Sequence, residues 1–318
     1  MDWSSTSERT IMRIASIDIG TNTILLLIVE ADKNGIVKVL HDEQVIARLG
    51  KGVDADRVIN QETFSRAEAF LKEYKDTCNR FNVNTIIAVG TSALRDAINQ
   101  IEFCEYIYSK TGIRIEIISG DEEAQWTYMG GISKFKDASN RFTVVDIGGG
   151  STEIITGNSV TIESKISLNI GSVRITERIL KTSPPENNSV EEAHEFILSQ
   201  IPSTISNQIS SSFPIGVAGT VTTLAAMNQQ LSHYDSEKID GFSLQYDDII
   251  EVFDKLKVLA LNQIKSIPQI SPGRADIILA GILILLGFME KTRLKIIRVS
   301  DRGLRYGIIF REIKKLFY

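Results

Sequence analysis

The sequence predicts an α/β protein built from two similar halves, with a ligand site between them. At 318 residues the chain is long for one hydrophobic core and suits two domains. Strands and helices alternate in a similar order in both halves of the chain. The motif strand-Asp-Ile-Gly also occurs twice, at Asp18-Ile19-Gly20 and at Asp146-Ile147-Gly148, and each time small or hydroxyl residues follow.

Composition restricts the function classes that the chain can have. Hydrophobic residues make up 43% and charged residues 24%, which is ordinary for a soluble globular protein. The net charge of −5 argues against a general nucleic-acid binder. The longest apolar run, residues 277–288, is too short to span a membrane. A polyanionic substrate would therefore need a local basic lining.

Cysteine usage points to a reducing compartment, so we expect a cytoplasmic location. Cys78 and Cys104 have no motif spacing, which predicts no disulfide framework. The three histidines are scattered without ligand spacing, so we expect no zinc site. Residues 1–12 open the chain without a secretory pattern, and we interpret them as a disordered extension.

The first half begins with apolar, β-rich runs on both sides of Ile19-Gly20-Thr21-Asn22, which predict a hairpin. Apolar residues then follow helical spacing from Phe64 to Tyr74. Ser92 could cap the next helix. The expected elements are strands at 13–18, 23–30 and 36–49, a helix at 61–81, a strand at 85–89, a helix at 93–109, a strand at 114–118 and a helix at 121–130.

The second half repeats this order with helical insertions. We expect strands at 142–147, 152–156 and 159–169, a helix beginning at 171, helices at 190–210, 221–230, 246–263 and 274–291, strands at 215–218 and 295–299, and a final helix at 302–318. A repeat on this scale indicates a duplicated domain that holds its ligand between the halves. By fold analogy the last helix packs back on the first domain, so we expect domains of 13–127 plus 302–318, and of 128–301.

Both hairpins are suited to hold phosphate. Glycines after a strand let the backbone approach a phosphate closely, and successive amide N–H groups form an anion-binding concavity. The first hairpin offers Gly20, Thr21, Asn22 and Thr23, and the second offers Gly148, Gly149, Gly150, Ser151 and Thr152. A tight structural hairpin is the alternative, but the repeat at matching places disfavours it. Gly219-Thr220 after a buried strand is a weaker turn of the same kind.

Three carboxylates accompany the two hairpins. Asp18, Asp146 and Glu153 would repel a phosphate in direct contact. They could instead hold Mg²⁺, a hard cation that binds carboxylates together with phosphate oxygens. The pattern therefore predicts a magnesium site, with Asp18 as part of the first phosphate-holding hairpin.

Hydrolysis of a phosphoanhydride also requires a group that positions or deprotonates water. Glu123, on the helix that links the halves, is a candidate, and its neighbour Glu122 competes with it. Asp121 and Glu122 could equally cap that helix. Arg95 could clamp phosphate or be an ordinary surface arginine. Arg274, beside Asp276, could be part of a structural ion pair.

These residues resemble the exopolyphosphatase/guanosine pentaphosphate phosphohydrolase (Ppx/GppA) family. The motifs that carry the resemblance extend over nearly the whole chain: Asp18 to Thr23, Gly90 to Arg95, Ile118 to Ala124, Val145 to Glu153, Ala218 to Thr220, and Ser300 to Arg305. The family belongs to the actin, sugar-kinase and Hsp70 ATPase superfold. The resemblance thus implies two ribonuclease-H-like domains with a cleft between them, in the short two-domain form.

The resemblance implies a hydrolase that releases the terminal phosphate of polyphosphate, or the 5′-γ-phosphate of guanosine pentaphosphate. It assigns water activation to Glu123, and Mg²⁺, with Mn²⁺ as a substitute, to Asp146 and Glu153. It places the terminal phosphates on the two hairpins with Arg95 beside them, and it implies a homodimer as one possible assembly. A non-catalytic binder and a sugar-type kinase are the rival classes. Where many members have Arg-Glu-Gly, this chain has Arg305-Tyr306-Gly307.

Overall fold

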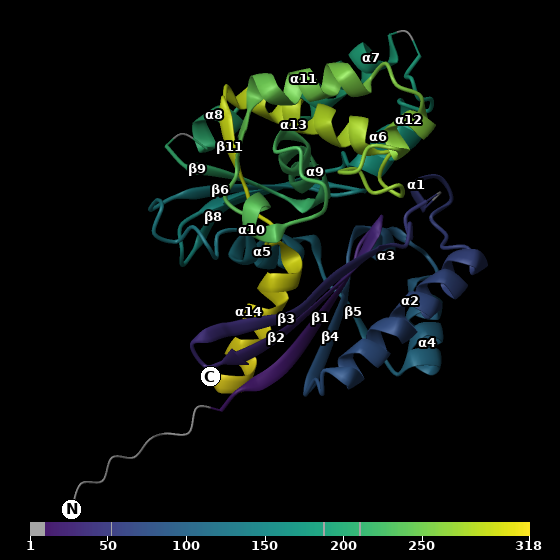
Figure 1. Cartoon of the computed structure of the whole chain (residues 1–318), viewed down its shortest axis with the longest axis vertical. Coiled ribbons are helices and arrows are strands. Elements are labelled where there is room, and N and C mark those ends of the chain that lie inside the picture. Colours follow the sequence, from purple (N-terminus) through teal and green to yellow (C-terminus); the bar gives the residue numbers. More distant parts are fainter. Residues whose placement is uncertain (1–9, 52, 187, 210) are drawn as a thin grey trace, which may run out of the picture.

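The computed structural model describes residues 10–51, 53–186, 188–209 and 211–318 (Figure 1). Most of the expected extension, residues 1–9, lies outside the described residues. Met12 already belongs to the first strand, so the end of that extension was placed too late. None of the described helices combines the length and the apolar character that crossing a membrane requires.

Two mixed sheets form the two halves, one above the other in Figure 1. The first has the order β3-β2-β1-β4-β5, and its strands are β1 (Met12–Ile19), β2 (Thr23–Asp32), β3 (Gly35–Ile46), β4 (Thr85–Gly90) and β5 (Ile115–Ile117). The second has the order β10-β11-β9-β6-β7-β8, and its strands are β6 (Phe142–Ile147), β7 (Thr152–Gly157), β8 (Ile162–Leu168), β9 (Phe213–Val217), β10 (Ser243–Gln245) and β11 (Ile296–Val299).

Strand directions match as well as strand order. In each sheet three consecutive strands are antiparallel, and the first of them pairs in parallel with the next strand along the chain. In the second sheet β10 adds a further edge strand beyond β11. The α/β class and the repeated strand order that the sequence predicts are therefore confirmed.

Several expected helices are broken into two. The single helix expected at 93–109 is α3 (Ser92–Asp96) and α4 (Gln100–Thr111). The chain is extended at Ala97, Ile98 donates its backbone N–H to the Arg57 carbonyl, and the Asn99 side chain bonds both the N–H and the carbonyl of Ile59. These contacts with a distant loop interrupt the helix. Ser92 lies inside α3, whose cap position is Thr91 and has no side-chain cap bond.

Two further expected helices are also divided. The helix expected at 190–210 is α7 (Ser189–Gln200) and α8 (Ile205–Gln208), because Ile201 is extended before Pro202. Residue 210 lies outside the described residues. The helix expected at 246–263 is α11 (Tyr246–Leu256) and α12 (Leu261–Lys265), separated by an extended Ala260.

The remaining helices complete both layers. They are α1 (Val53–Asp56), α2 (Gln61–Arg80), α5 (Gly120–Gly131), α6 (Ser172–Arg178), α9 (Ala218–Asn228), α10 (Ser236–Ile239), α13 (Ile278–Thr292) and α14 (Leu304–Phe317). The apolar helix α13 begins later than the expected residue 274 and is buried almost throughout.

Helix α14 returns to the first sheet after the last strand of the second. Its apolar face, including Ile309 and Ile313, packs in one cluster with Ile14 of β1 and with Leu27 and Val29 of β2. It also packs along α5, which in turn contacts β7 and β8 of the second sheet. The expected boundary between residues 127 and 128 falls inside α5. The division into domains stays a prediction, and α5 and α14 together join the halves.

The crossing of α5 and α14 depends on Gly307. A Cβ atom there would overlap the backbone carbonyl of Trp126, which a side-chain movement cannot relieve. We expect Gly307→Ala to lower the free energy of unfolding by about 1–3 kcal/mol, as other overpacking substitutions do. Urea unfolding followed by circular dichroism would measure this. Gly303→Ala is the control, because its Cβ would meet no atom within 4 Å. Equal losses in both variants would contradict the packing argument.

Candidate active site

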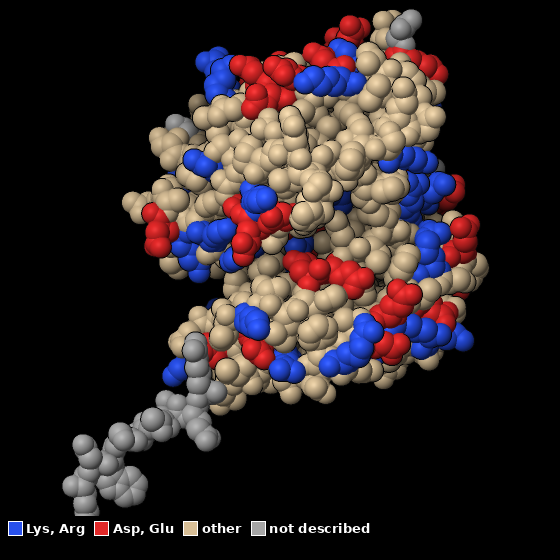
Figure 2. Space-filling model, in the orientation of Figure 1, with Lys and Arg blue, Asp and Glu red and all other residues tan. Residues whose placement is uncertain are grey.

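A cavity of about 560 Å³ lies between the two sheets, and both halves line it. Figure 2 shows a groove across the middle of this face, with acidic side chains along its lower wall. Thirteen of the site residues expected from the sequence line the cavity: Asp18, Gly20, Thr21, Asn22, Thr23, Glu123, Asp146, Gly148, Gly149, Gly150, Ser151, Gly219 and Thr220. The fold thus brings residues from both ends of the chain to one place.

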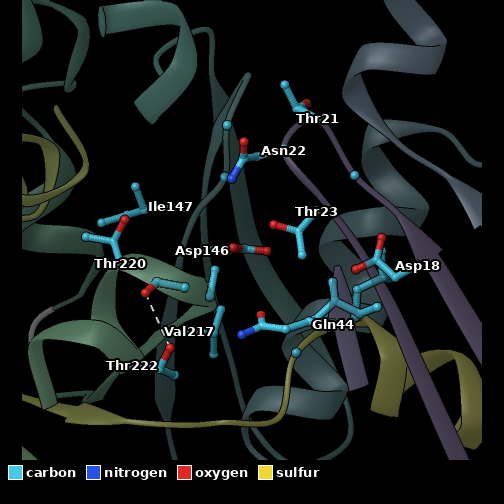
Figure 3. Close-up of a pocket in the computed structure, with 18 of the residues that line it drawn as sticks. Asp18, Thr21, Asn22, Thr23, Gln44, Asp146, Ile147, Val217, Thr220 and Thr222 are labelled. Carbon is cyan, nitrogen blue, oxygen red and sulfur yellow. Dashed lines mark hydrogen bonds between the residues drawn. The ribbon is translucent and has the colours of Figure 1, made fainter. Parts of the chain in front are cut away.

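The two hairpin turns have the same local structure. Gly20 donates its N–H to the Thr23 carbonyl, and Gly148 donates its N–H to the Ser151 carbonyl, each at 3.0 Å. Each turn therefore holds its short loop against the cavity at the end of a central strand. Figure 3 shows Asn22 and Thr23 of the first turn facing Asp146 and Thr220 of the second half.

The Asn22 side chain offers the cavity a hydrogen-bond donor that a ligand could use. It is 9% exposed and lines the cavity, and its amide nitrogen has no hydrogen-bond partner among the described residues. Buried amide donors are almost always bonded in folded proteins. An acceptor such as a phosphate oxygen would satisfy this nitrogen.

Asp146 and Glu153 face each other across the β6–β7 hairpin. They are direct partners in the antiparallel register, so their side chains lie on the same face of the sheet. Glu153 is 2% exposed and accepts a 2.8 Å hydrogen bond from the Ser167 hydroxyl. Asp18 reaches the same cavity from β1, as Figure 3 shows.

This crowding of buried carboxylates raises their pKa values. Burial, and then the charge of Glu123, raises the pKa of Asp18 to about 7. Burial and the charges of Glu123 and Asp18 raise the pKa of Asp146 to about 7. Burial and the charges of Glu123 and Asp146 raise the pKa of Glu153 to about 8. Without a cation, the cluster would hold protons near neutral pH.

The structure separates the two candidate glutamates. Glu122 accepts hydrogen bonds from the Ser119 N–H at 3.0 Å and hydroxyl at 2.9 Å, which completes the capping box at the start of α5. Glu123 turns inward, is 9% exposed and lines the cavity. Only Glu123 is therefore placed to act on a ligand there.

Arg95 holds Glu123 in position. Its Nη1 donates to Glu123 Oε2 at 2.6 Å and to the Ile118 carbonyl at 3.1 Å. Burial raises the pKa of Glu123, and Arg95 opposes this rise. Arg95 lies behind Glu123 and is not among the described residues that line the cavity.

Two other expected residues lie behind the cavity wall. Thr152 is 1% exposed and donates its hydroxyl to the Ile170 carbonyl at 2.7 Å. We therefore assign it a structural role in place of the expected phosphate contact. Glu153 lies behind Asp146, so it would act on a ligand of the cavity through Asp146.

The described residues contain no group of three acidic, histidine or cysteine side chains arranged to hold a metal ion. Mg²⁺ does not need such a group, because it typically binds one or two carboxylates and completes its shell with water and substrate phosphates. Asp146, which lines the cavity beside two loops that could hold phosphate and has Glu153 as its cross-strand partner, fits this donor set.

Arg274 is a cavity residue that sequence reasoning left undecided. It is 8% exposed, and it donates from Nη1 to the Gly219 carbonyl at 2.9 Å. Its expected partner Asp276 instead pairs with Arg48 at 3.0 Å. Among the described residues no carboxylate forms an ion pair with Arg274. A buried cation without a counter-ion in a cavity favours an anionic ligand. The residues next to Arg274 in the sequence, Ala275 and Asp276, did not indicate that Arg274 could bind an anion.

Arg305 was part of a recognised motif but had no expected role. Its Nη2 bonds Asp42 Oδ2 of β3 at 3.0 Å and Asp301 Oδ1 at 3.2 Å, and Tyr234 donates to the same Asp301 oxygen at 2.6 Å. All four side chains line the cavity. The network ties the first sheet to segments of the second half. Tyr306, whose effect was unknown, is 5% exposed and packs with the apolar face of α14.

Comparisons with known proteins agree with this arrangement. The model of the Ppx/GppA phosphatase family matches residues 27–316. The chain is 33% identical over 311 residues to exopolyphosphatase 2 of Mycobacterium tuberculosis, covering 93% of this chain and 97% of that protein. It is 32% identical to a crystallised Aquifex aeolicus member of the Ppx/GppA family, with a TM-score of 0.80, 97% of this chain and 100% of that chain covered.

A longer relative matches this chain over part of its length. The bifunctional 3-dehydroquinate synthase/phosphatase of Fusobacterium nucleatum is 35% identical over 311 residues. The match covers 94% of this chain and 46% of that protein. The chain therefore spans about half the length of this relative.

Proposed function

The chain belongs to the Ppx/GppA phosphatase family, and we propose that it is a hydrolase that removes the terminal phosphate from inorganic polyphosphate. The observation that carries this proposal is the pair of matching hairpins that face one cavity, with Glu123 between them. The relative named exopolyphosphatase 2 matches nearly from end to end, which supports the same activity.

The reaction adds water to the terminal phosphorus and breaks the bond to the bridging oxygen. Orthophosphate forms, and the chain that leaves is one phosphate shorter. Glu123 orients the attacking water and accepts its proton. Arg95 keeps the Glu123 carboxylate in place through their 2.6 Å bond. Backbone N–H groups of both hairpins and the Asn22 amide stabilise the charge that develops on the phosphate oxygens.

The carboxylates imply a divalent cation, and Mg²⁺ is the first choice. Asp146 would hold it, with Glu153 behind, and Asp18 faces the same space. A bound Mg²⁺ neutralises phosphate oxygens and lowers the barrier to attack. Mn²⁺, which also prefers carboxylate and phosphate oxygens, is expected to substitute.

Guanosine pentaphosphate is the second candidate substrate. A cavity of about 560 Å³ lies within the range of small-molecule sites and exceeds what a terminal phosphate requires. Its wall beyond the hairpins includes Gly219, Thr220 and Thr222, which could face a nucleoside. A cytoplasmic location and a homodimer stay predictions.

Phosphate release would decide between these candidates. Purified protein with Mg²⁺ is incubated with short polyphosphate, long polyphosphate, guanosine pentaphosphate and ATP. We expect the highest kcat/KM on polyphosphate. Higher values on guanosine pentaphosphate would favour the second candidate. No release from any of them, together with measurable binding of polyphosphate, would make the protein a binder and reject the hydrolase.

Stability should depend on pH and Mg²⁺ in a linked way. Asp18, Asp146 and Glu153 have raised pKa values, so the folded state binds protons more tightly than the unfolded state. Without metal, stability should therefore fall as pH rises from about 5 to 8. Mg²⁺ should restore the lost stability and raise Tm by more at pH 8 than at pH 5. A gain of 1 kcal/mol in stability corresponds to a rise in Tm of about 2–4 °C.

Differential scanning fluorimetry measures both effects. Asp146→Asn should reduce the pH dependence and the Mg²⁺ shift. The control is Asp121→Asn, which changes an exposed carboxylate that pairs with Lys165. An equal Mg²⁺ shift at pH 8 in wild type and Asp146→Asn would contradict the assignment of the cation to this carboxylate.

A further inference from the structure

A second, much smaller cavity of about 20 Å³ lies beside the hairpin turns. It shares four lining residues with the large cavity, Thr21, Ser92, Gly149 and Gly150. Its remaining walls are Gly50, Val53, Ala93, Asp96, Val173 and Arg174. The four shared residues therefore form a partition between the two cavities.

The partition is thin and is made by both halves of the protein. Thr21 and Ser92 come from the first half, and Gly149 and Gly150 from the second. A Cβ atom at Gly149 would lie 2.9 Å from Thr21 Cβ, and one at Gly150 would lie 2.6 Å from Ser92 Oγ. Side chain and backbone thus meet in a single layer, and any relative movement of the halves would change this layer.

Arg174 forms the far wall. Its Nε donates to the Gly150 carbonyl at 2.8 Å, and its Nη2 pairs with Asp96 Oδ2 at 3.3 Å. The first contact attaches the guanidinium to the back of the phosphate-holding turn. The second crosses from α6 of the second half to α3 of the first. The Asp96 side chain is 48% exposed, so this bridge lies where the small cavity approaches the surface.

On the premise of the proposed function, the reaction requires a separate route by which orthophosphate can leave. In an in-line attack the shortened chain leaves on the side opposite the water. That chain then occupies the large cavity while orthophosphate remains against the hairpin turns. Departure through the large cavity would take orthophosphate past the chain that still occupies it.

We propose that the small cavity is the exit site for orthophosphate and that Arg174 is its anion-binding residue. A volume of about 20 Å³ holds a water molecule but no phosphate. Orthophosphate therefore leaves when the halves shift and the Arg174–Asp96 pair separates. The Asp96 side of this pair is 48% exposed, so solvent screens the pair, which contributes little free energy and can open during turnover.

The test compares cleavage with release. Rapid quench measures the cleavage of short polyphosphate, and a fluorescent phosphate-binding protein measures the release of orthophosphate. Asp96→Asn should accelerate release about three- to fivefold. Ala93→Leu fills the small cavity and should slow release at least about tenfold, with Val173→Leu as the substitute if Ala93→Leu does not fold. Cleavage in a single turnover should be unchanged in all three.

Asp276→Asn is the matched control, because it removes a different ion pair between the halves, Arg48–Asp276, and does not touch the small cavity. If release is accelerated equally in Asp276→Asn and Asp96→Asn, the cause is weaker contact between the halves, and the proposed exit site is overturned. Unchanged release in both Asp96→Asn and Ala93→Leu would overturn it as well.

A second measurement separates the exit from the hydrolase activity. The dissociation rate of orthophosphate from each protein is measured by ³¹P NMR exchange in Mg²⁺ buffer, without any substrate. We expect orthophosphate to dissociate fastest from Asp96→Asn, more slowly from wild type and slowest from Ala93→Leu. If this order holds while wild type cleaves nothing, the proposed function fails and the exit stands. If wild type cleaves polyphosphate and the order is absent, the exit fails and the function stands.

Discussion

Glu123→Gln should reduce kcat for phosphate release from polyphosphate by about 100- to 10,000-fold, the usual range for loss of a general base. The amide keeps the size of the side chain and can still bond Arg95, but it accepts no proton from water. KM should change little, because Glu123 faces the water and not the polymer. Steady-state phosphate release at saturating polyphosphate and Mg²⁺ measures this.

Glu122→Gln is the matched control for that variant. It makes the same chemical change one residue earlier, at a side chain used to cap α5. Its activity should stay within about twofold of wild type, with a loss of stability of about 1 kcal/mol or less. Full activity in Glu123→Gln would refute the role of Glu123, and an equal loss in Glu122→Gln would show that the helix, and not the carboxylate, matters.

Arg274→Gln should raise KM for polyphosphate by about 10- to 100-fold, the value of one or two hydrogen bonds to a charged group. Burial lowers the pKa of the Arg274 guanidinium, and no described carboxylate pairs with it, so its charge is available to an anionic ligand. Glutamine retains a donor that can bond the Gly219 carbonyl. Initial rates over a range of polyphosphate concentrations give KM and kcat separately.

Arg48→Gln is the control for Arg274→Gln. Arg48 is paired with Asp276 and is about one-third exposed, so its charge is already balanced. We expect its KM to stay within about twofold of wild type. The anion-binding role of Arg274 would be refuted by an unchanged KM in Arg274→Gln, provided circular dichroism shows that the variant is folded.

The repeated hairpins were predictable because their information is local. A strand, a carboxylate, a glycine turn and a second strand follow one another within a few residues at both places. Strand periodicity identified the five strands of the first sheet and five of the six strands of the second for the same reason. The short strand β10 was missed, because three residues carry too little pattern to be recognised.

The helix breaks could not be predicted in this way. The segment 93–109 has helical composition throughout, yet Asn99 bonds the backbone of Ile59 and interrupts it. That contact joins residues 40 positions apart, and no local propensity reports it. The break at Ile201 is different, because Pro202 follows it and is a local signal for the end of a helix. The prediction gave more weight to the helical spacing of the apolar residues than to this proline.

The α/β class, the duplicated strand order and the two turns that face the cavity could be predicted from the sequence, because each depends on residues that are neighbours in the chain. Which groups meet is a property of the folded structure. It gave Glu122 to a helix cap and Glu123 to the cavity, buried the Thr152 hydroxyl against Ile170, and paired Asp276 with Arg48 so that Arg274 faces the cavity. Burial and partner choice depend on which segments pack together, and the distances along the chain do not encode them.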